Sequence, residues 1–475
     1  MNSQSTPDAI ESRPSVTTGD RLRVYCRDLD VNGRGICRPL DAQGSMIEGL
    51  TLFVTNALPG ETLAAEIDSV RKRLAEGHTV ERLESSPDRI TPPCPLYGDC
   101  GGCNLQHLTY SAQLEAKRRQ VVTALSRLGG FPLETLEPIT AQTVPSPSEW
   151  AYRNNAQYPV AYENDRVQIG FYAAASHRIV DGTRCLIQDP AADLVRSLVR
   201  DFSRAAAVTQ LLVRTAKNTP EVMVALLARN PDALAAAPEL ARLTEKLARA
   251  LASQGKKLAS FWLNQASERA ATVPGRRWLH IYGAKTITET INGLRYEIAP
   301  PAFFQVNSEQ TSRLYELAVE ACGLSGRETV LDLYCGSGTI SCALAREAAR
   351  VIGIEVVVES IENARRNADA NGLGRRCSFF LGEAEKVLPS LVRDGLQADV
   401  VLVDPPRKGC DPALLAAIKA IAPNRIVYVS CDPATLARDL KELKTDYDLV
   451  SVTPVDMFPQ TMHVETVVLM SRVDK

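Results

Sequence analysis

The stretch ETVLDLYCGSGT, residues 328–339, joins a short apolar run to a turn that contains two glycines. From here to the C-terminus, β-branched apolar runs alternate with segments of helical pattern. The strand-like runs are ETVLDLY, RVIGIEV, CSFFLG, DVVLVD, NRIVYVS and HVETVVLMS. This alternation predicts a doubly wound, Rossmann-like α/β domain over residues 301–475.

Polar side chains stand where several of these runs end. Tyr334 and Thr339 flank the glycine turn, Glu355 follows the second run and Asp404 follows the fourth. In a doubly wound sheet these ends face one crevice, where ligands bind. A dinucleotide fingerprint would have a third glycine where Ser341 stands. The pattern therefore favours a nucleoside ligand without a pyrophosphate, such as S-adenosylmethionine, over a purely structural sheet, with Glu355 accepting hydrogen bonds from the ribose.

Cys431 directly follows the fifth run, in RIVYVSCDPATLARDL, residues 425–440. Asp432 suits the N-cap of the next helix and Pro433 its first position. A thiol at a helix N-terminus is expected to have a lowered pKa, which would make Cys431 a nucleophile. Farther along, His463 and Glu465 are two residues apart on an extended segment, so both should face one side, where either could act as a base.

The rest of the chain divides into blocks of different pattern. Residues 1–18 are polar and predict a disordered tail. Residues 19–85 alternate short apolar runs with Gly and Pro turns, which predicts a small OB-like β-barrel. Residues 86–300 mix helical and strand patterns and predict a central α+β domain.

Composition narrows the class of protein. The chain has 475 residues, a net charge of −2 and no apolar run long enough to cross a membrane, so we expect a cytoplasmic protein without a membrane partner. Residues 94–300 carry 24 Lys+Arg against 18 Asp+Glu. That surplus is compatible with a polyanionic partner but is more typical of a solvated surface. The oligomeric state stays open, with a monomer as the simplest expectation.

Three cysteines lie within ten positions, in CPLYGDCGGCNLQ, residues 94–106. Cys94, Cys100 and Cys103 stand in a loop rich in glycine and proline. In a reducing compartment such a cluster more often binds a metal or serves catalysis than forms disulfides.

Six motifs together resemble the S-adenosylmethionine-dependent RNA uracil-C5 methyltransferases. They are FFQVN (303–307), DLYCGSGT (332–339), GIE (353–355), DPPRKG (404–409), SCDPATLARD (430–439) and HVETV (463–467). The cysteine loop with the later Cys185 resembles the iron–sulfur site of the branch that acts on 23S ribosomal RNA. The leading barrel looks like the TRAM-type barrel of that branch.

The resemblance implies a role for each matching residue. Cys431 would be the nucleophile that adds to C6 of uracil, and Glu465 the base that removes the C5 proton. The residues implied to hold S-adenosylmethionine are Gln305, Tyr334, Thr339, Glu355 and Asp404. The residues implied to hold a [4Fe-4S] cluster are Cys94, Cys100, Cys103 and Cys185. The partner would be RNA, most simply 23S ribosomal RNA.

Other interpretations remain open at this point. Zinc is the main rival for the four cysteines, because tetrahedral Cys₄ sites are common. The enzyme could act on transfer RNA, or on an exocyclic amine, a reaction with no use for Cys431. A non-catalytic iron–sulfur protein that binds RNA is the alternative outside enzymes. One departure from the family is Asp432, where asparagine is usual; its charge would oppose ionisation of Cys431 unless Arg407, Arg438 or the helix dipole compensates.

Overall fold

The computed structural model describes residues 16–268, 270 and 272–473. They form two compact units, one of residues up to Thr91 with His107–Ala112, the other of Pro92–Gln106 and Gln113 onward. The tail was predicted over residues 1–18, and residues 1–15 of it lie outside the described part of the chain. Among the described residues, no helix has the length and apolar character needed to span a membrane.

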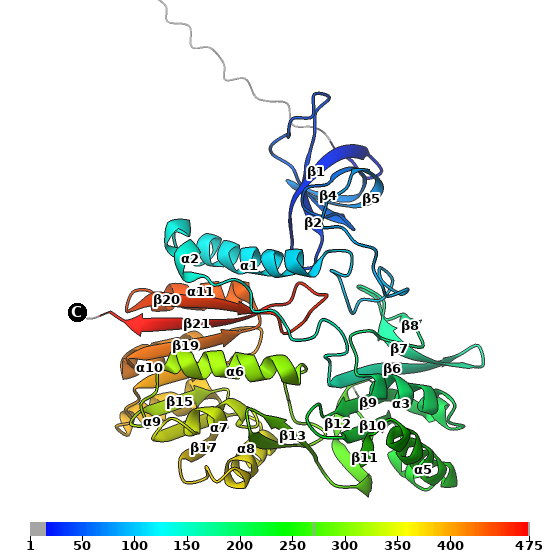
Figure 1. Cartoon of the computed structure of the whole chain (residues 1–475), viewed down its shortest axis with the longest axis vertical. Helices are drawn as coiled ribbons and strands as arrows, with labels where there is room; N and C mark the ends of the chain where they lie inside the picture. Colours follow the sequence, from blue (N-terminus) through cyan, green and yellow to red (C-terminus); the bar gives the residue numbers. More distant parts are fainter. Residues whose placement is uncertain (1–15, 269, 271, 474–475) are drawn as a thin grey trace, which may run out of the picture. The chain divides into compact units, whose positions relative to one another are not determined.

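The first unit contains the predicted β-barrel (Figure 1). Its strands are β1 (Arg21–Leu29), β2 (Gly35–Pro39), β3 (Thr51–Thr55), β4 (Thr62–Arg71) and β5 (Leu74–Glu84). They close in the order β1-β2-β3-β5-β4. Alternate residues point inward, so Leu63, Ala65 and Ile67 of β4 are buried together in the barrel core. The barrel predicted from the sequence is confirmed.

The second unit contains two large sheets, of which the first is a mixed sheet flanked by helices. The sheet consists of β6 (Asn155–Glu163), β7 (Arg166–Tyr172), β8 (Ile179–Asp181), β9 (Val208–Thr215), β10 (Glu221–Ala228), β11 (Lys257–Ala266) and β12 (Pro274–Gly283). The other elements are α3 (Pro190–Arg200), η1 (Ala205–Ala207), α4 (Pro231–Ala235), α5 (Pro238–Ser253), β13 (Ile287–Ile291) and β14 (Leu294–Ile298). Val195 of α3 and Leu247 of α5 are buried in the core of this sheet.

A second seven-stranded sheet follows. It contains β15 (Thr329–Leu333), β16 (Arg350–Glu355), β17 (Cys377–Leu381), β18 (Val400–Val403), β19 (Arg425–Ser430), β20 (Tyr447–Val455) and β21 (Glu465–Arg472). The helices are α6 (Ser308–Cys322), α7 (Thr339–Ala345), α8 (Val358–Ala370), α9 (Ala384–Arg393), α10 (Pro412–Ile421) and α11 (Pro433–Leu443). The strand order is β17-β16-β15-β18-β19-β21-β20. This is the predicted doubly wound architecture, with the order reversing between β15 and β18.

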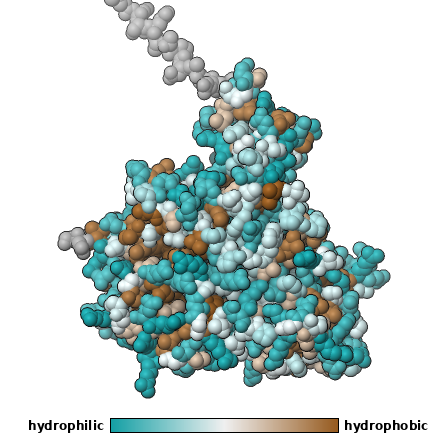
Figure 2. Space-filling view, viewed as in Figure 1, coloured by the Kyte–Doolittle hydropathy of each residue, from teal (hydrophilic) through white to brown (hydrophobic). Residues whose placement is uncertain are grey.

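Helices cover both faces of this sheet because its strands are apolar on both sides (Figure 1). Val330 of β15 faces a core that includes Leu314 of α6, whereas its neighbour Leu331 faces the core that includes Leu414 of α10. On the visible surface, apolar residues lie in small groups among polar ones (Figure 2).

The sequence reading missed one strand of this sheet. β20 pairs antiparallel with β21, which in turn pairs antiparallel with β19. Pro454 argues against a strand in the sequence, because proline cannot donate to a sheet ladder. In the structure β20 is the edge strand, where one row of amides needs no sheet partner.

Two helices precede the sheets in the chain, α1 (Tyr110–Arg127) and α2 (Leu133–Ile139). From Gln113 onward α1 packs against the second sheet, with Val121 and Leu125 in its core. Lys117 of α1 is fully buried, and its ammonium bonds the carboxylate of Asp456 and donates to the carbonyl of Phe458 at 3.1 Å. Burial lowers the pKa of Lys117, although Asp456 opposes this.

Replacing Lys117 with methionine should therefore destabilise the second unit by about 3 kcal/mol, because Asp456 would be left buried without its cation. Urea unfolding followed by tryptophan fluorescence measures this, since Trp150, Trp262 and Trp278 all lie in this unit. The Lys117→Met/Asp456→Leu double variant should recover most of the loss. A single variant as stable as the parent would contradict the expected cost.

Candidate active site

A cavity of about 770 Å³ opens at the carboxyl ends of β15, β16, β18 and β19. We call it the strand-end cavity. It is lined by every residue that the sequence assigned to catalysis or to the nucleoside ligand: Gln305, Tyr334, Thr339, Glu355, Asp404, Cys431 and Glu465. His463 lines it as well. Because parallel strands end at one edge, residues about 160 positions apart in the chain meet here.

The glycine turn after β15 has left-handed backbone conformations at three positions. Tyr334, Gly336 and Gly338 have φ values of 65°, 53° and 74°. A Cβ on Gly338 would lie 2.8 Å from the Cβ of Ala364, so only glycine fits there. Ser341, in place of a third glycine, is buried and donates to the carboxylate of Asp332.

Backbone amides hold Glu355 in place. Its Oε1 accepts hydrogen bonds from the amides of Val356 at 2.8 Å and Val357 at 2.9 Å, and its Oε2 accepts one from Gly336 at 3.1 Å. The carboxylate is thus fixed at the rim of the glycine turn. Thr339 is fixed similarly, by a 2.7 Å bond between its hydroxyl and that of the buried Tyr315.

Three acidic side chains meet in this cavity with little to neutralise them. Burial raises the pKa of Asp332 to about 7, helped by Asp404 and Glu355. Burial also raises the pKa of Asp404 to about 7. The pKa of Glu465, 4% exposed, is well above its ordinary value because of burial and the nearby Asp404, with Arg407 opposing the shift. An acidic, partly desolvated cavity of this kind suits a cationic ligand.

The prediction of a low pKa for Cys431 is wrong. Burial, with the carboxylates of Glu465 and Asp404, raises the pKa of the Cys431 thiol to about 11. Asp432 is the N-cap, as predicted, and its carboxylate accepts the amides of Ala434 and Thr435 at 2.9 Å each. These two amides are bonded to the Asp432 carboxylate, so they are not available to stabilise a thiolate at Cys431.

Of the two arginines expected to compensate for Asp432, one does so. Arg407 lines the strand-end cavity and lowers the pKa of Cys431. Arg438 instead donates to the carboxylate of Asp439 at 2.8 Å and to the carbonyl of Lys408 at 2.9 Å. The positive charge facing Cys431 therefore comes from the DPPR motif.

This electrostatic balance predicts the pH dependence of Cys431 alkylation. With a pKa of about 11, the thiolate fraction should rise about tenfold per pH unit from pH 7 to pH 10. We expect iodoacetamide labelling, followed by mass spectrometry, to accelerate in the same proportion. Arg407→Gln should slow labelling at each pH, whereas the control Arg438→Gln should not. A labelling rate that levels off near pH 8 would show that the pKa of the Cys431 thiol is not raised.

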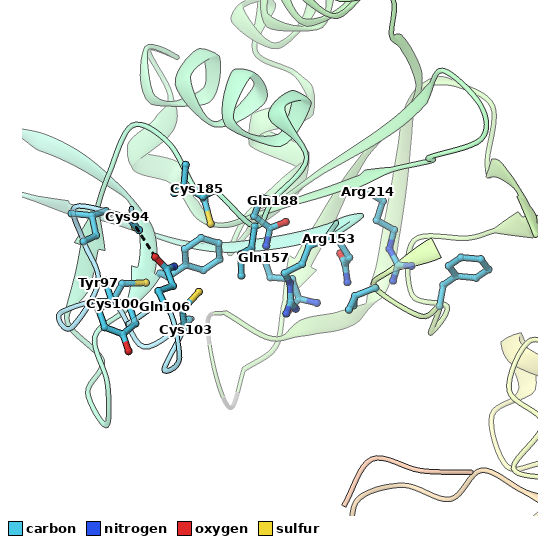
Figure 3. A pocket seen from close by; sticks show the side chains of 18 of the residues that line it. Cys94, Tyr97, Cys100, Cys103, Gln106, Arg153, Gln157, Cys185, Gln188 and Arg214 are labelled. Atoms are coloured by element: carbon cyan, nitrogen blue, oxygen red, sulfur yellow. Dashed lines mark hydrogen bonds between the residues drawn. The ribbon is translucent and has the colours of Figure 1, made fainter. Parts of the chain in front are cut away.

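The four cysteines of the predicted cluster also meet in one place. Cys94, Cys100, Cys103 and Cys185 line a second cavity of about 620 Å³, which we call the cysteine cavity (Figure 3). Burial raises the pKa of Cys103 to about 12 and that of Cys185 to about 11, and the neighbouring thiols add to both shifts. Within the described part of the chain, no three His, Cys, Asp or Glu side chains are grouped closely enough to hold a single metal ion.

The cysteine loop is bonded directly to the loop that leads into Glu465, a contact with no signal in the sequence. The amides of Asn104 and Leu105 donate to the carbonyl of Gln460 at 3.1 and 3.0 Å. The amide of Met462 donates to the side chain of Asn104 at 3.0 Å. Gln460 itself has a φ of 70°. The cysteine loop and the loop before Glu465 are therefore held together by hydrogen bonds.

Comparisons with known proteins show the family that the chain resembles. A family model described as tRNA (Uracil-5-)-methyltransferase matches residues 284–473. A Halalkalibacterium halodurans protein named as an uncharacterized RNA methyltransferase is 39% identical over 468 residues, 96% of this chain and 98% of that protein. A Clostridium tetani protein with the same description is 39% identical over 469 residues, 96% of this chain and 97% of that protein.

One solved structure resembles nearly the whole chain. It is the Pyrococcus abyssi tRNA (uracil-54, C5)-methyltransferase in complex with S-adenosyl-L-homocysteine. The two chains are 26% identical, with a TM-score of 0.69, and the match covers 94% of this chain and 100% of that one.

Proposed function

The chain belongs to the S-adenosylmethionine-dependent RNA (uracil-5-)-methyltransferases, and on this premise we propose that it methylates C5 of one uridine in 23S ribosomal RNA, with Cys431 as nucleophile. The observation that carries this proposal is the joint lining of one cavity by Cys431, Glu465 and Asp404. An enzyme that methylates an exocyclic amine would have no use for the thiol.

Activation of the uracil ring is the role of Cys431 in this proposal. C5 of uracil is a weak nucleophile, and a thiolate bond to C6 converts the ring into an enolate with electron density at C5. C5 then attacks the methyl carbon, and the sulfonium sulfur leaves with the bonding electrons. The pKa of Cys431, about 11, already includes the lowering by Arg407, so ionisation of the thiol needs a further positive charge. The sulfonium of the methyl donor would supply it.

The residues for the methyl donor follow from the chemistry of the cavity. The carboxylate of Glu355, fixed by three backbone amides, accepts hydrogen bonds from the ribose hydroxyls. Asp404 lies among buried acids that favour a cation, and Tyr334, Thr339 and Gln305 complete the lining. The uridine enters from the side of Cys431, and it must be single-stranded or flipped out for both of its faces to be reached.

Glu465 is the base in this proposal. After methyl transfer, C5 carries both a methyl group and a proton, and loss of that proton expels the cysteine and restores the ring. A carboxyl whose pKa is raised by burial is a stronger base once it is ionised. His463 is the alternative, but partial desolvation in the cavity and the nearby Arg407 lower the pKa of its imidazole, which makes it the weaker base.

We propose that the four thiols of the cysteine cavity would hold an iron–sulfur cluster. They line one cavity, and four thiolates are a ligand set that such a cluster takes. We assign Cys94, Cys100, Cys103 and Cys185 as its ligands. With all four positions taken by protein, it would supply structural rigidity next to the catalytic loop.

We assign RNA binding to the barrel, residues 19–85, the cluster to 86–300 and catalysis to 301–475, in a cytoplasmic monomer. We propose ribosomal RNA as the target because the barrel and the four cysteines resemble those of the branch that acts on 23S ribosomal RNA. Transfer RNA is the second candidate, because the similar Pyrococcus abyssi protein is named for a uridine of transfer RNA.

One experiment tests both the chemistry and the target. Anaerobically purified protein is incubated with S-adenosylmethionine and 5-fluorouridine-containing transcripts of 23S ribosomal RNA or of transfer RNA. Fluorine at C5 cannot leave as a proton does, so a cysteine-first enzyme remains bound to its product. We expect a covalent complex with the 23S transcript that resists denaturation and maps to Cys431. A complex with transfer RNA alone would reassign the substrate, and active protein without any complex would reject the mechanism.

A further inference from the structure

The cysteine cavity has a second end that the cysteines do not explain. In Figure 3 the four cysteines lie toward one side, whereas Arg153, Gln157, Gln188 and Arg214 lie toward the other. These four polar side chains come from three places in the chain: the start of β6, the segment before α3, and β9. A cluster held by thiolates would occupy the first end and leave this polar end unexplained.

Two atoms at this polar end are buried without a hydrogen-bond partner. They are Nε of Arg153 and Oε1 of Gln188, and no described residue satisfies either one. Gln188 is 3% exposed, so bulk water does not reach it freely. Buried polar atoms are nearly always bonded in folded proteins. One unmet donor and one unmet acceptor in the same cavity therefore indicate a polar ligand.

The charge at this end is also uncompensated. Arg214 donates to the carbonyl of Ala302 at 2.6 Å, and neither Arg214 nor Arg153 has an ion pair with a described carboxylate. Burial lowers the pKa of Arg214 to about 10, with no acid opposing it. Two guanidinium groups without a carboxylate partner among the described residues suit a phosphate, which accepts planar, paired hydrogen bonds.

The polar end adjoins the place where the uridine would react. Phe303, Phe304 and Val306 line the cysteine cavity and the strand-end cavity alike. Phe303 is 67% exposed, unusually so for a phenylalanine in a lining segment. Exposed aromatic rings beside basic side chains are typical platforms for unstacked RNA bases.

We propose that the polar end of the cysteine cavity binds a nucleotide of the RNA strand adjacent to the reacting uridine. Arg153 and Arg214 contact its phosphate, Gln157 and Gln188 contact the edge of its base, and Phe303 stacks between this base and the uridine. The side-chain amides can both donate and accept, so this subsite contributes to sequence selection. The inference rests on the proposed function in that the RNA is the methylated substrate.

RNA binding by single variants tests the subsite. The probe is unmodified 23S transcript, or the transfer RNA transcript if that is the one trapped, bound in the presence of S-adenosylhomocysteine. Arg153→Gln and Gln157→Ala should each weaken RNA binding about tenfold. Affinity for S-adenosylhomocysteine should stay within about twofold, since no proposed contact to it changes. The matched control is Arg277→Ala, which removes an exposed arginine paired with Asp232 at 2.6 Å outside the cavity.

Salt dependence separates the two kinds of contact. Arg153→Gln should reduce the slope of log affinity against log salt by about one, because one phosphate contact is lost, whereas Gln157→Ala should leave it unchanged. Gln157 is exposed on β6, so its truncation leaves the fold intact. If both variants bind RNA as tightly as Arg277→Ala, or if all three weaken equally, the subsite is wrong. Methylation that survives Cys431→Ala would reject the proposed function. It would leave the RNA-binding results for the Arg153, Gln157 and Arg277 variants unchanged.

Discussion

Replacing Cys431 with alanine is expected to lower the rate of uridine methylation by about four orders of magnitude or more. The reason is that the thiolate bond to C6 activates C5. The other thiol lining the strand-end cavity, Cys335, is buried, and burial raises its pKa well above the ordinary value. The helix cap belongs to Asp432, so α11 and the shape of the cavity should persist. Single-turnover transfer of a radiolabelled methyl group to RNA measures the effect.

Two controls separate the loss of the Cys431 nucleophile from a loss of stability or of S-adenosylhomocysteine binding. Cys377→Ala removes a buried thiol from β17 in the same sheet and should retain methylation within about threefold, since a small truncation there costs stability rather than chemistry. Calorimetric binding of S-adenosylhomocysteine should be unchanged in Cys431→Ala. If Cys431→Ala still methylates RNA, product analysis would be expected to find the methyl group on an exocyclic amine, and the covalent mechanism would be abandoned.

Replacing Glu465 with glutamine is expected to slow product release about 10³-fold and to make a covalent protein–RNA complex accumulate on ordinary uridine RNA. Glutamine keeps the size of the buried side chain but cannot accept the C5 proton. The methylated adduct then keeps its bond to Cys431. A denaturing gel of the reaction shows the complex directly, without fluorinated RNA.

The competing base gives the control for Glu465. His463→Ala should retain methylation within about tenfold and form no lasting complex, because Glu465 remains to accept the C5 proton. If His463→Ala accumulates the complex instead, the base is His463. If Glu465→Gln loses activity without any complex, Glu465 acts before methyl transfer, on the ionisation of Cys431.

Local sequence determined much of the fold and which residues line the site. The β-branched runs from residue 329 onward predict buried strands because only a sheet covered on both faces accommodates them. Strand ends then predict that Tyr334, Glu355, Asp404 and Cys431 converge, since parallel strands finish at a common edge. The Asp432 cap follows from residue type alone, because its carboxylate suits the free amides of α11.

The electrostatics of the site were decided only by the tertiary structure. The pKa of Cys431 depends on burial and on Glu465 and Asp404, which come from different strands, so a local helix argument gave the wrong direction. Strand β20 was missed for a related reason, because Pro454 is acceptable only at a sheet edge and the edge is a property of the whole sheet. The bonds from Asn104 to Gln460 and the polar end of the cysteine cavity likewise join residues far apart in the chain. Side-chain identity fixes what each group can do, whereas burial and long-range neighbours fix its charge and its partner.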